Sequence, residues 1–264
     1  MPYNFKPSTL FIGKKVVSLP SCHSTNDELA KMIPDAENDP SLEGTVVVTD
    51  HQTAGRGQRG NRWEAQPGQN LTFSLLLKPA FLRASAQFDL SIAVALGIYE
   101  SLRQHLDESE LRIKWPNDIY YTPPNESHQK LGGLLLENTL QGYQVSISIV
   151  GIGLNVNQME FLVPGATSLR RATGQPFDYD LEVLLARLLE CLEAEYLRLR
   201  QGGHPAQKAR YLARLFRYQE WHPYRSHGRL FNAQLLGVDE TGRLALETTE
   251  GVQYFGMKEV EFVI

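Results

Sequence analysis

The sequence predicts a chain of two parts, an α/β or α+β core over residues 1–218 and a small SH3-like β-barrel over residues 219–264. Strand-like runs alternate with helix-like runs through most of the chain, which is typical of a sheet packed with helices. From about Glu220 onward, roughly 45 residues read as short strands separated by turns, which suits a small barrel. With 264 residues the chain can bury a sizeable core without crosslinks.

Local patterns in the first half of the chain predict its elements in order. Thr25 and Glu28 have the spacing of a capping box, which indicates a helix start. Alternating apolar residues over 71–77 and again over 145–149 indicate strands. The predicted elements are a helix beginning within Ser24–Glu28, a buried strand at 45–49, a loop at 51–62, a strand at 71–77, an amphipathic helix at 87–105, a strand at 111–114, a polar loop at 122–129, a strand at 131–137 and a strand at 145–149 that ends in Gly151-Ile152-Gly153.

The second half begins with the clearest helix in the sequence, at 180–200. Its apolar residues fall on one face, as expected for a helix that packs on a core; they are Leu181, Leu184, Leu185, Leu188, Leu192, Tyr196 and Leu199. A second helix is predicted at 204–216, followed by a boundary near 217–222. The barrel strands are expected at 231–238, 244–248 and 252–257, with Phe231, Tyr254 and Phe255 in its core.

Composition and charge exclude several classes of protein. The chain carries 26 Lys and Arg against 30 Asp and Glu, and this net charge of −4 disfavours DNA binding. No apolar run approaches the ~18 to 20 residues that a membrane span needs, and the N-terminus lacks the apolar stretch of a signal peptide. Cys22 and Cys191 are too far apart in the sequence for a metal motif. These features predict a reduced, cytoplasmic protein with no metal-type cluster.

The loop at 55–62, GRGQRGNR, is the most unusual stretch. It contains three glycines and three arginines and no acidic residue. Glycine lets backbone N–H groups approach a ligand closely, and arginine offers a planar fork of donors for phosphate or carboxylate. The loop therefore predicts an anion site, with a solvated basic turn as the alternative. Trp63 follows directly and is suited either to stacking on a nucleotide base or to ordinary core packing.

Three further motifs combine polar groups with rigid or small residues. In Lys114-Trp115-Pro116-Asn117-Asp118, a carboxylate could assist a metal–phosphate complex or accept a proton from an amine, and the alternative is a simple turn. Lys130 precedes a Gly132-Gly133 pair, and strand glycines often mark close approach of a ligand. The run 151–157, GIGLNVN, lacks the third glycine of a dinucleotide fingerprint, and no Walker phosphate loop is present.

Read in order, STN at 24–26, GRGQRGNRW, KWPNDIYY, KLGGLLLE and GIGLNVN make this chain resemble the biotin protein ligase family. The resemblance covers residues 18–157, and the family also has a small barrel at its C-terminus. It implies a catalytic domain akin to class II aminoacyl-tRNA synthetases, with a mixed sheet and flanking helices. The implied activity is ATP-dependent ligation: biotin and MgATP form biotinyl-5′-AMP, and biotin then moves to one lysine of a biotin carboxyl carrier protein domain.

The resemblance also implies roles for individual residues. The catalytic residues would be Lys130, Arg56 and Asp118, with Asp118 near the incoming lysine amine. The biotin-binding residues would be Ser24, Thr25, Asn26, Gln52, Arg56, Gly57, Gln58, Lys130, Gly132 and Gly133, with the two last leaving room for the bicyclic ring. The nucleotide-binding residues would be Arg59, Arg62, Trp63, Asn117 and Asn155, with Asn155 reading the adenine.

The chain departs from the family pattern at two points. Gln58 and Asn61 stand where arginines are frequent in the loop, which predicts weaker retention of the adenylate, with Arg59 and Arg62 as compensating charges. Only 23 residues precede Ser24, so the enzyme-only form, without the N-terminal DNA-binding domain of some relatives, is expected.

Three other functions stay open from the sequence alone. A lipoate ligase or octanoyltransferase shares the catalytic architecture, a non-catalytic adaptor would use the barrel to bind peptides, and a transcriptional repressor is disfavoured by the charge. The sequence also leaves a homodimer open.

Overall fold

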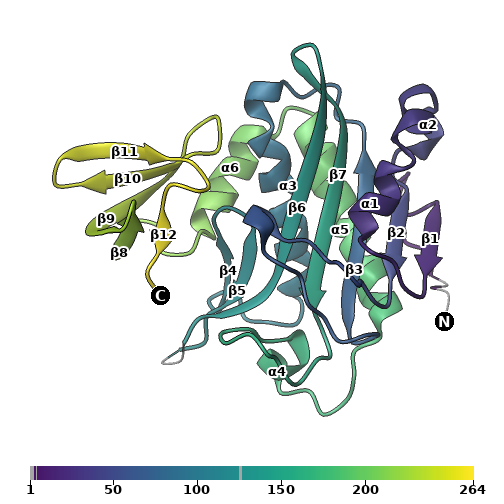
Figure 1. Cartoon of the computed structure of the whole chain (residues 1–264), viewed down its shortest axis with the longest axis horizontal. Helices are drawn as coiled ribbons and strands as arrows, with labels where there is room; N and C mark the ends of the chain where they lie inside the picture. Colours follow the sequence, from purple (N-terminus) through teal and green to yellow (C-terminus); the bar gives the residue numbers. More distant parts are fainter. Residues whose placement is uncertain (1–2, 4, 125–126) are drawn as a thin grey trace.

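A computed structural model describes residues 3, 5–124 and 127–264 (Figure 1). The larger, N-terminal part contains, in order, β1 Val16–Leu19, α1 Thr25–Ala30, α2 Ile33–Asn38, η1 Pro40–Leu42, β2 Val46–Thr49, η2 Gln58–Gly60, β3 Asn70–Leu77, η3 Ala84–Ala86, α3 Phe88–Leu102, β4 Leu111–Lys114, β5 Asp118–Tyr121, β6 Gln129–Gln141, β7 Gln144–Asn155, α4 Leu169–Thr173, α5 Leu181–Arg200 and α6 His204–Ala213. The C-terminal part contains β8 Trp221–Ser226, β9 Arg229–Val238, β10 Leu244–Thr248, β11 Gly251–Phe255 and β12 Glu261–Phe262.

The main sheet has seven strands in the order β1-β2-β3-β7-β6-β5-β4. Strands β1 and β2 are parallel, and the other neighbours are antiparallel, so the sheet is mixed. Helix α1 lies in front of the sheet beside β2 and β3, whereas α3, α5 and α6 lie behind it (Figure 1). A mixed sheet with flanking helices is the predicted fold class.

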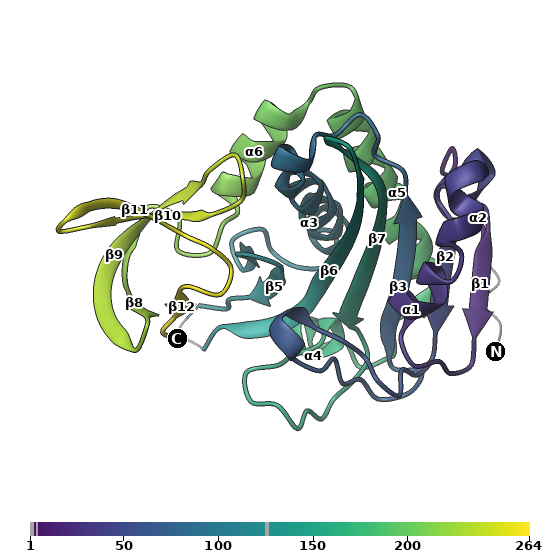
Figure 2. The ribbon, with the colours of Figure 1, turned by 45° about the horizontal axis from the view of Figure 1, so that its top comes forward.

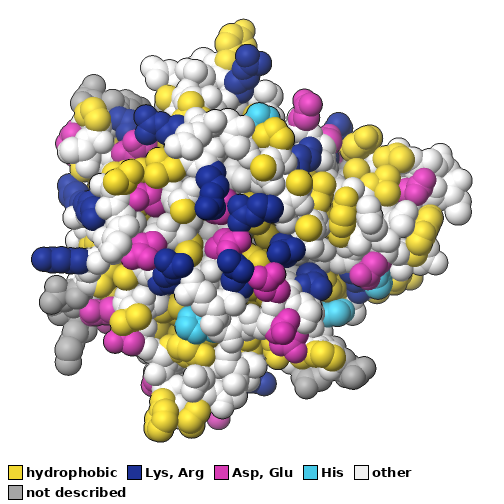
Figure 3. Space-filling model, turned by 180° about the vertical axis from the view of Figure 1, so that it is seen from behind, with side chains coloured by type: hydrophobic (Ala, Val, Ile, Leu, Met, Phe, Trp, Pro, Cys, Tyr) yellow, Lys and Arg dark blue, Asp and Glu magenta, His cyan; other side chains and the backbone are white. Residues whose placement is uncertain are grey.

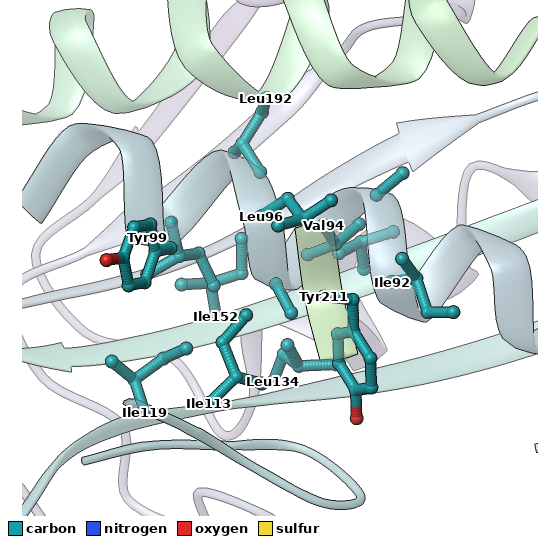
Figure 4. Close-up of a cluster of buried hydrophobic side chains, with 14 of the residues drawn as sticks. Ile92, Val94, Leu96, Tyr99, Ile113, Ile119, Leu134, Ile152, Leu192 and Tyr211 are labelled. Atoms are coloured by element: carbon teal, nitrogen blue, oxygen red, sulfur yellow. The ribbon is translucent and has the colours of Figure 1, made fainter. Parts of the chain in front are cut away.

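The core lies between the sheet and the rear helices. Helix α3 is buried on almost every side, so it is not amphipathic as predicted, because the sheet covers one face and α5 and α6 cover the other. At the crossing of α3 and α5, a Cβ on Gly97 would come within 2.9 Å of the Leu192 Cα, so a larger residue would force the helices apart. Figure 4 shows Leu192 of α5 over α3 and Ile113, Leu134 and Ile152 of the sheet below it.

The predicted boundaries of most elements hold within a few residues, with three corrections. Ser24, not Thr25, is the N-cap of α1, and its side chain makes no capping hydrogen bond. The Thr25 hydroxyl bonds to Gln52 and Ser74 instead of capping the helix. Strand β7 continues through Gly151 and Gly153 to Asn155, because Asn70–Leu77 of β3 pairs along that whole length. The elements β1, α2, α4, β8 and β12 were not predicted, since each is short and lacks a strong periodic pattern.

The C-terminal part is a small antiparallel sheet in the order β11-β10-β9-β8-β12. Hydrogen bonds that join it to the main unit include those from Trp115 Nε1 to the Gly242 oxygen at 2.9 Å and from Arg217 Nη1 to the Val263 oxygen at 3.0 Å. Phe255 is buried as predicted, but Tyr254 is 49% exposed, because the alternation of β11 points it to the outer face. The prediction of Tyr254 in the barrel core is therefore wrong.

The rear surface carries basic and acidic side chains side by side (Figure 3). Arg210 of α6, for example, lies 2.6 Å from Glu100 of α3, and Arg214 lies 3.1 Å from Glu108. These pairs neutralise each other, so this face presents no extended field of one sign. Within the described residues, no helix is both long and apolar enough to cross a membrane.

Candidate active site

A cavity of about 400 Å³ opens on the front of the sheet, a volume that suits a small-molecule ligand. Its wall comes from the start of α1, the loop after β2, the β4–β5 turn, the middle of β6 and β7, and the C-terminal strand β12. Figures 1 and 2 show the loop after β2 as the dark-blue segment that crosses in front of β6. We name the three parts of this cavity the polar end, the lid and the charged end.

The polar end consists of Ser24, Thr25, Asn26 and Gln52, with Ser74 beneath them. Strands β1 and β2 are parallel and leave the sheet at the same edge, and a bridge between Cys22 and Gln52 extends their pairing. This parallel exit brings the start of α1 against Gln52, although the two are far apart in sequence.

Hydrogen bonds fix the side chains of the polar end. Gln52 Oε1 accepts from the Thr25 N–H at 2.7 Å and from its hydroxyl at 3.1 Å. Ser74 Oγ lies 2.7 Å from Thr25 Oγ1 and donates to Asn26 Oδ1 at 2.5 Å. Ser24, Thr25 and Asn26 are each at most 4% exposed. Buried and mutually bonded, these groups form a rigid set of neutral donors and acceptors.

Gly151 and Gly153 of β7 leave space for the side chains of neighbouring elements to pack on the strand. A Cβ on Gly151 would overlap the amide oxygen of Asn26, and a Cβ on Gly153 would lie 2.5 Å from the Trp63 ring. Trp63 therefore lies flat on β7, and its Nε1 donates to Thr72 Oγ1 at 3.3 Å. This run is a packing surface for the site and not a phosphate cradle.

The lid is residues 55–62, which fold back on themselves as a narrow hairpin. Trp63 N donates to the Gly55 oxygen at 3.0 Å, and Gly57 N donates to the Asn61 oxygen at 2.7 Å. Arg56 Nη2 donates to Asp27 Oδ1 at 2.6 Å and to Glu137 Oε2 at 3.1 Å. The base of the lid is thus anchored by Trp63, while its cationic side chain is engaged by two carboxylates.

The charged end centres on an ion pair between Lys130 Nζ and Asp118 Oδ1 at 2.6 Å. Asp118 opens β5 and Lys130 lies near the start of β6, and the two strands are adjacent. Gly133 faces the same place, because its Cβ would lie 3.2 Å from Asp118 Oδ1. The carboxylate therefore positions the ammonium group of Lys130 at the wall of the cavity.

The β4–β5 turn and β12 complete the charged end. Asn117 is bonded to Leu134 in both directions, with its Nδ2 donating at 2.8 Å and its backbone oxygen accepting at 2.9 Å. Lys114 Nζ lies 5.2 Å from the Tyr120 ring centroid and 4.9 Å from that of Phe262. Burial, and then the negative charge of Asp118, raise the pKa of Tyr120 to about 12, so its phenol stays neutral at physiological pH.

Most of the residues predicted for the site line this one cavity. They are Ser24, Thr25, Asn26, Gln52, Arg56, Gly57, Gln58, Arg62, Trp63, Asn117, Asp118, Lys130 and Gly133. Gly132 does not line it, because the place of its Cβ is taken by the Gly153 oxygen of β7. Asn155 is 4% exposed and donates to the Thr167 oxygen at 3.0 Å, so it too lies outside the wall. The Arg59 side chain lies outside the described residues.

Other residues of the site were not predicted. Glu137 and Asp27 engage Arg56, and Glu261 and Phe262 line the charged end. Thr72 and Ser74 had a visible signal, because the alternation that places Leu71 and Phe73 on one face of β3 places these two on the other. No sequence signal indicated that β12 contributes to the cavity, since that strand is about 100 residues beyond the rest of the site.

Comparison with known proteins identifies relatives of the chain. Residues 20–157 match the model of the biotin/lipoate A/B protein ligase family. The chain is 32% identical over 247 residues to a bifunctional ligase/repressor BirA of Bacillus subtilis, covering 90% of this chain and 72% of that protein. It is also 32% identical to a biotin–(acetyl-CoA-carboxylase) ligase of Paracoccus denitrificans, covering 90% of this chain and 97% of that enzyme.

Solved structures show the same architecture. A biotin protein ligase from Aquifex aeolicus in complex with biotin and ATP superposes with a TM-score of 0.74 at 26% sequence identity, covering 95% of this chain and all of that one. A mutant of the same enzyme in complex with biotin gives a TM-score of 0.73.

Proposed function

The chain belongs to the biotin/lipoate A/B protein ligase family, and we propose that it is an ATP-dependent ligase that attaches biotin to protein. In the first step, the biotin carboxylate attacks the α-phosphate of ATP, and biotinyl-5′-AMP and pyrophosphate form. In the second step, a lysine amine of a biotin carboxyl carrier domain attacks the acyl carbon, so an amide forms and AMP leaves.

One observation carries this proposal: neutral hydrogen-bonding groups at one end share a single cavity with the basic side chains of Arg56, Arg62 and Lys130. Biotin has the same two-ended character, with a ureido ring at one end and a carboxylate at the other. Lipoate and octanoate have no ureido group and would leave the polar groups of buried Thr25 and Asn26 and of half-buried Gln52 without a ligand partner. A site built to hydrogen-bond its ligand rejects analogues that lack the bonding groups by large factors. The polar end therefore favours biotin.

The first step requires two anions to meet, and we assign Arg56 and Lys130 to offset their repulsion. Lys130 is held at the cavity wall by Asp118 at 2.6 Å, so its charge is in place before substrates arrive. Preorganised charge of this kind stabilises the negative charge that develops on the transferred phosphoryl group. Holding both substrates in one cavity contributes further, because orientation alone accounts for ~7 to 11 kcal/mol in favourable cases.

Mg²⁺ enters as part of the nucleotide substrate in this proposal. Among the described residues no cluster of three or more His, Cys, Asp or Glu side chains is placed to hold a metal ion. Asp118 and Glu261 are carboxylates in the cavity wall, and these two would face an ion carried by the phosphates. Hard oxygen ligands of this type are the ones that Mg²⁺ prefers.

The lid and Trp63 would protect the acyl-adenylate from water. The intermediate is a mixed anhydride and hydrolyses readily, so a segment that covers it preserves it for transfer. In the second step, we assign Asp118 to orient the incoming lysine amine or accept its proton. Asp118 is 16% exposed and lies beside Lys130. An amine that reaches Asp118 would therefore also reach the acyl carbon of the adenylate, which we place at Lys130.

The remaining parts of the proposal concern the surroundings of the site. We propose that residues 1–218 form the catalytic domain and 219–264 the C-terminal barrel, with the junction just before β8, which begins at Trp221. Cys22 and Cys191 form no disulfide, which agrees with a reducing compartment such as the cytoplasm. A homodimer stays open, and the mass of the purified protein in solution would establish it.

Mass spectrometry of a carrier domain tests the proposal directly. The purified chain is incubated with MgATP, the carrier domain and biotin, lipoate or octanoate in parallel. We expect the carrier to gain one biotinyl group only when ATP and biotin are both present. Transfer of lipoyl or octanoyl groups at a comparable rate would assign the chain to the other branch of its family, and absence of any adenylate would favour an adaptor.

A further inference from the structure

We propose that Glu137 and Asp27 are positioning residues that form an acidic clamp on Arg56, and that an anionic ligand must compete with this clamp for the guanidinium. The proposal rests on the proposed function of the cavity, in which Arg56 binds the carboxylate or phosphate of the substrate. It adds two carboxylates that set how strongly the site selects an anion.

The geometry places both carboxylates on one nitrogen of Arg56. Its Nη2 lies 2.6 Å from Asp27 Oδ1 and 3.1 Å from Glu137 Oε2. Asp27 comes from α1 and Glu137 from β6, so the clamp joins two elements of the main fold to the lid. One cation between two anions leaves a local charge of −1. An approaching carboxylate therefore meets a guanidinium that is already neutralised.

Glu137 is itself held in place from below. Its Oε2 accepts from Asn26 Nδ2 at 2.6 Å, and the Asn26 oxygen accepts from the buried Ser74 hydroxyl at 2.5 Å. Asn26 is 4% exposed, and its amide packs so closely on Gly151 that a Cβ at that glycine would overlap Asn26 Oδ1. A chain of hydrogen bonds thus runs from the floor of the polar end through Asn26 to Glu137. The carboxylate is a preorganised acceptor and not a freely rotating surface group.

The clamp holds the part of the lid that lies away from its anchored base. The base of the lid is fixed where Trp63 packs on Gly153 and bonds to Gly55. Away from this base, the charged contacts of Arg56 tie the lid to α1 and β6, whereas Gln58 makes only a 3.8 Å contact with the Met257 sulfur. Arg56, Asp27 and Glu137 are each about 40 to 50% exposed. Ion pairs at such exposure are weak enough to be exchanged for contacts with a ligand anion.

The ratio of two affinities isolates the effect of the clamp. Biotin and biotinamide share the ring and chain, but only biotin carries a negative charge, so the ratio of their dissociation constants cancels contributions from the polar end. The variants Glu137→Gln and Asp27→Asn each remove one competitor for Arg56. We expect each to raise the preference for biotin over biotinamide about three- to fivefold, the range that an exposed ion pair supports. The double variant should raise it further, but less than the product, because both carboxylates share one nitrogen.

Glu28→Gln is the matched control, because it removes the same charge from α1 one residue away. Glu28 pairs with Lys31 at 2.7 Å instead of Arg56. We expect its ratio to stay within about twofold of the unchanged protein. Trypsin supplies a second readout that needs no ligand: in both clamp variants the lid arginines should be cut faster than in the control.

The outcomes separate the clamp from the proposed function. If the ratio in Glu137→Gln and Asp27→Asn equals that of the unchanged protein, or falls, the carboxylates do not compete for Arg56 and the clamp is overturned. If the unchanged protein binds neither biotin nor biotinamide in calorimetry, the proposed function fails first. The trypsin comparison then still reports whether the two carboxylates hold the lid.

Discussion

The polar end of the cavity and its lid are built on opposite principles. At the polar end, Thr25 and Asn26 are buried and Gln52 is half-buried. Thr25 is bonded to Gln52, and Asn26 is bonded to Ser74 and Glu137, so each side chain has a fixed orientation. In the lid, Arg56 is exposed and its partners are exposed carboxylates. Substitutions at the polar end should therefore disturb the shape of the site. Substitutions in the lid should instead change how readily Arg56 exchanges its carboxylate partners for a ligand anion.

The charged end lies between these two cases. Lys130 and Asp118 form a short ion pair on adjacent strands, so the charge is held by the sheet, yet Lys130 is still 38% exposed. A strand supports its side chains more rigidly than a loop does, and preorganised charge is the form that stabilises a transition state. The comparison thus predicts that Lys130 matters more for the reaction rate than Arg56.

The largest expected effect is at Lys130. Lys130→Ala should slow biotin-dependent pyrophosphate exchange by about 100-fold, the range found when one preorganised donor is removed. Arg56→Ala should slow the same reaction at least about tenfold, because a loop cation contributes less. Exchange of radiolabel between pyrophosphate and ATP measures both rates.

Lys31→Ala serves as the control, since it removes a surface lysine that pairs with Glu28 on α1. Circular dichroism should show the same fold in all three variants. Near-normal exchange in both Lys130→Ala and Arg56→Ala would remove the two residues from the site, and a larger loss in Arg56→Ala would reverse the ranking of lid and strand.

A smaller effect is expected at the polar end. In Gly151→Ala the new Cβ would overlap the Asn26 amide oxygen and break its bonds to Ser74 and Glu137. Loss of one buried hydrogen-bonded orientation costs ~1 to 3 kcal/mol, so biotin should bind about tenfold more weakly in calorimetry.

Two further variants sharpen this test. Ser148→Ala, three residues earlier on β7, should leave biotin affinity unchanged. Combining Gly151→Ala with Asn26→Ala removes the overlap, so it should restore stability toward urea without restoring affinity. Full affinity in Gly151→Ala alone would mean that Asn26 does not contact the ligand.

The sequence predicted those parts of the site that are encoded locally. The lid and Lys130 each occupy a short run whose residue types already suggest anion binding, and the run at 114–118 suggested a carboxylate for a metal–phosphate complex or an amine. The order of the runs carried the resemblance. Helix α5 was predicted for a similar reason, since its seven apolar residues repeat over five turns and Asp180 caps it with bonds to two backbone N–H groups.

Contacts between distant elements could not be predicted. Glu137 lies on a strand where alternation says only which face it occupies, and nothing in the sequence pairs it with Arg56 81 residues earlier. The glycines at 132 and 133 looked equivalent, yet Gly132 receives the β7 backbone and Gly133 makes room for Asp118. Helix α3 looked amphipathic because a sequence does not reveal that α5 and α6 cover its outer face.

Gln58 offers a moderate effect within the lid. The family loop often has arginine there, and Gln58 lines the cavity. Gln58→Arg adds a positive charge beside the adenylate, so release of biotinyl-5′-AMP should slow about two- to fivefold, as expected for one exposed ion pair. Rapid filtration of enzyme loaded with adenylate measures the rate. Gln58→Met, similar in length but uncharged, is the control, and equal release from the arginine variant would show that charge in the lid does not govern retention.

The smallest effect on catalysis is expected at Asp239, which supports the charged end from a distance. Burial alone would raise its pKa, but hydrogen bonds from Arg243 and Thr241 outweigh it and lower the pKa to about 2. These bonds fix the turn that presents the Gly242 oxygen to Trp115. A carboxyl pKa below its unfolded value of ~3.9 contributes stability that is present above about pH 4 and lost as the pH falls toward 2. Asp239→Asn should therefore lower the free energy of unfolding by about 1 kcal/mol at pH 7, since a surface carboxylate is screened by solvent, and by progressively less at acid pH.

Urea titrations at pH 7, 5 and 3 measure this, with Glu240→Gln in the same turn as the control. Pyrophosphate exchange should stay within about twofold, because the turn acts on packing and not on the reacting groups; a constant loss of stability at all three pH values would show that the charge of Asp239 is not what holds the turn.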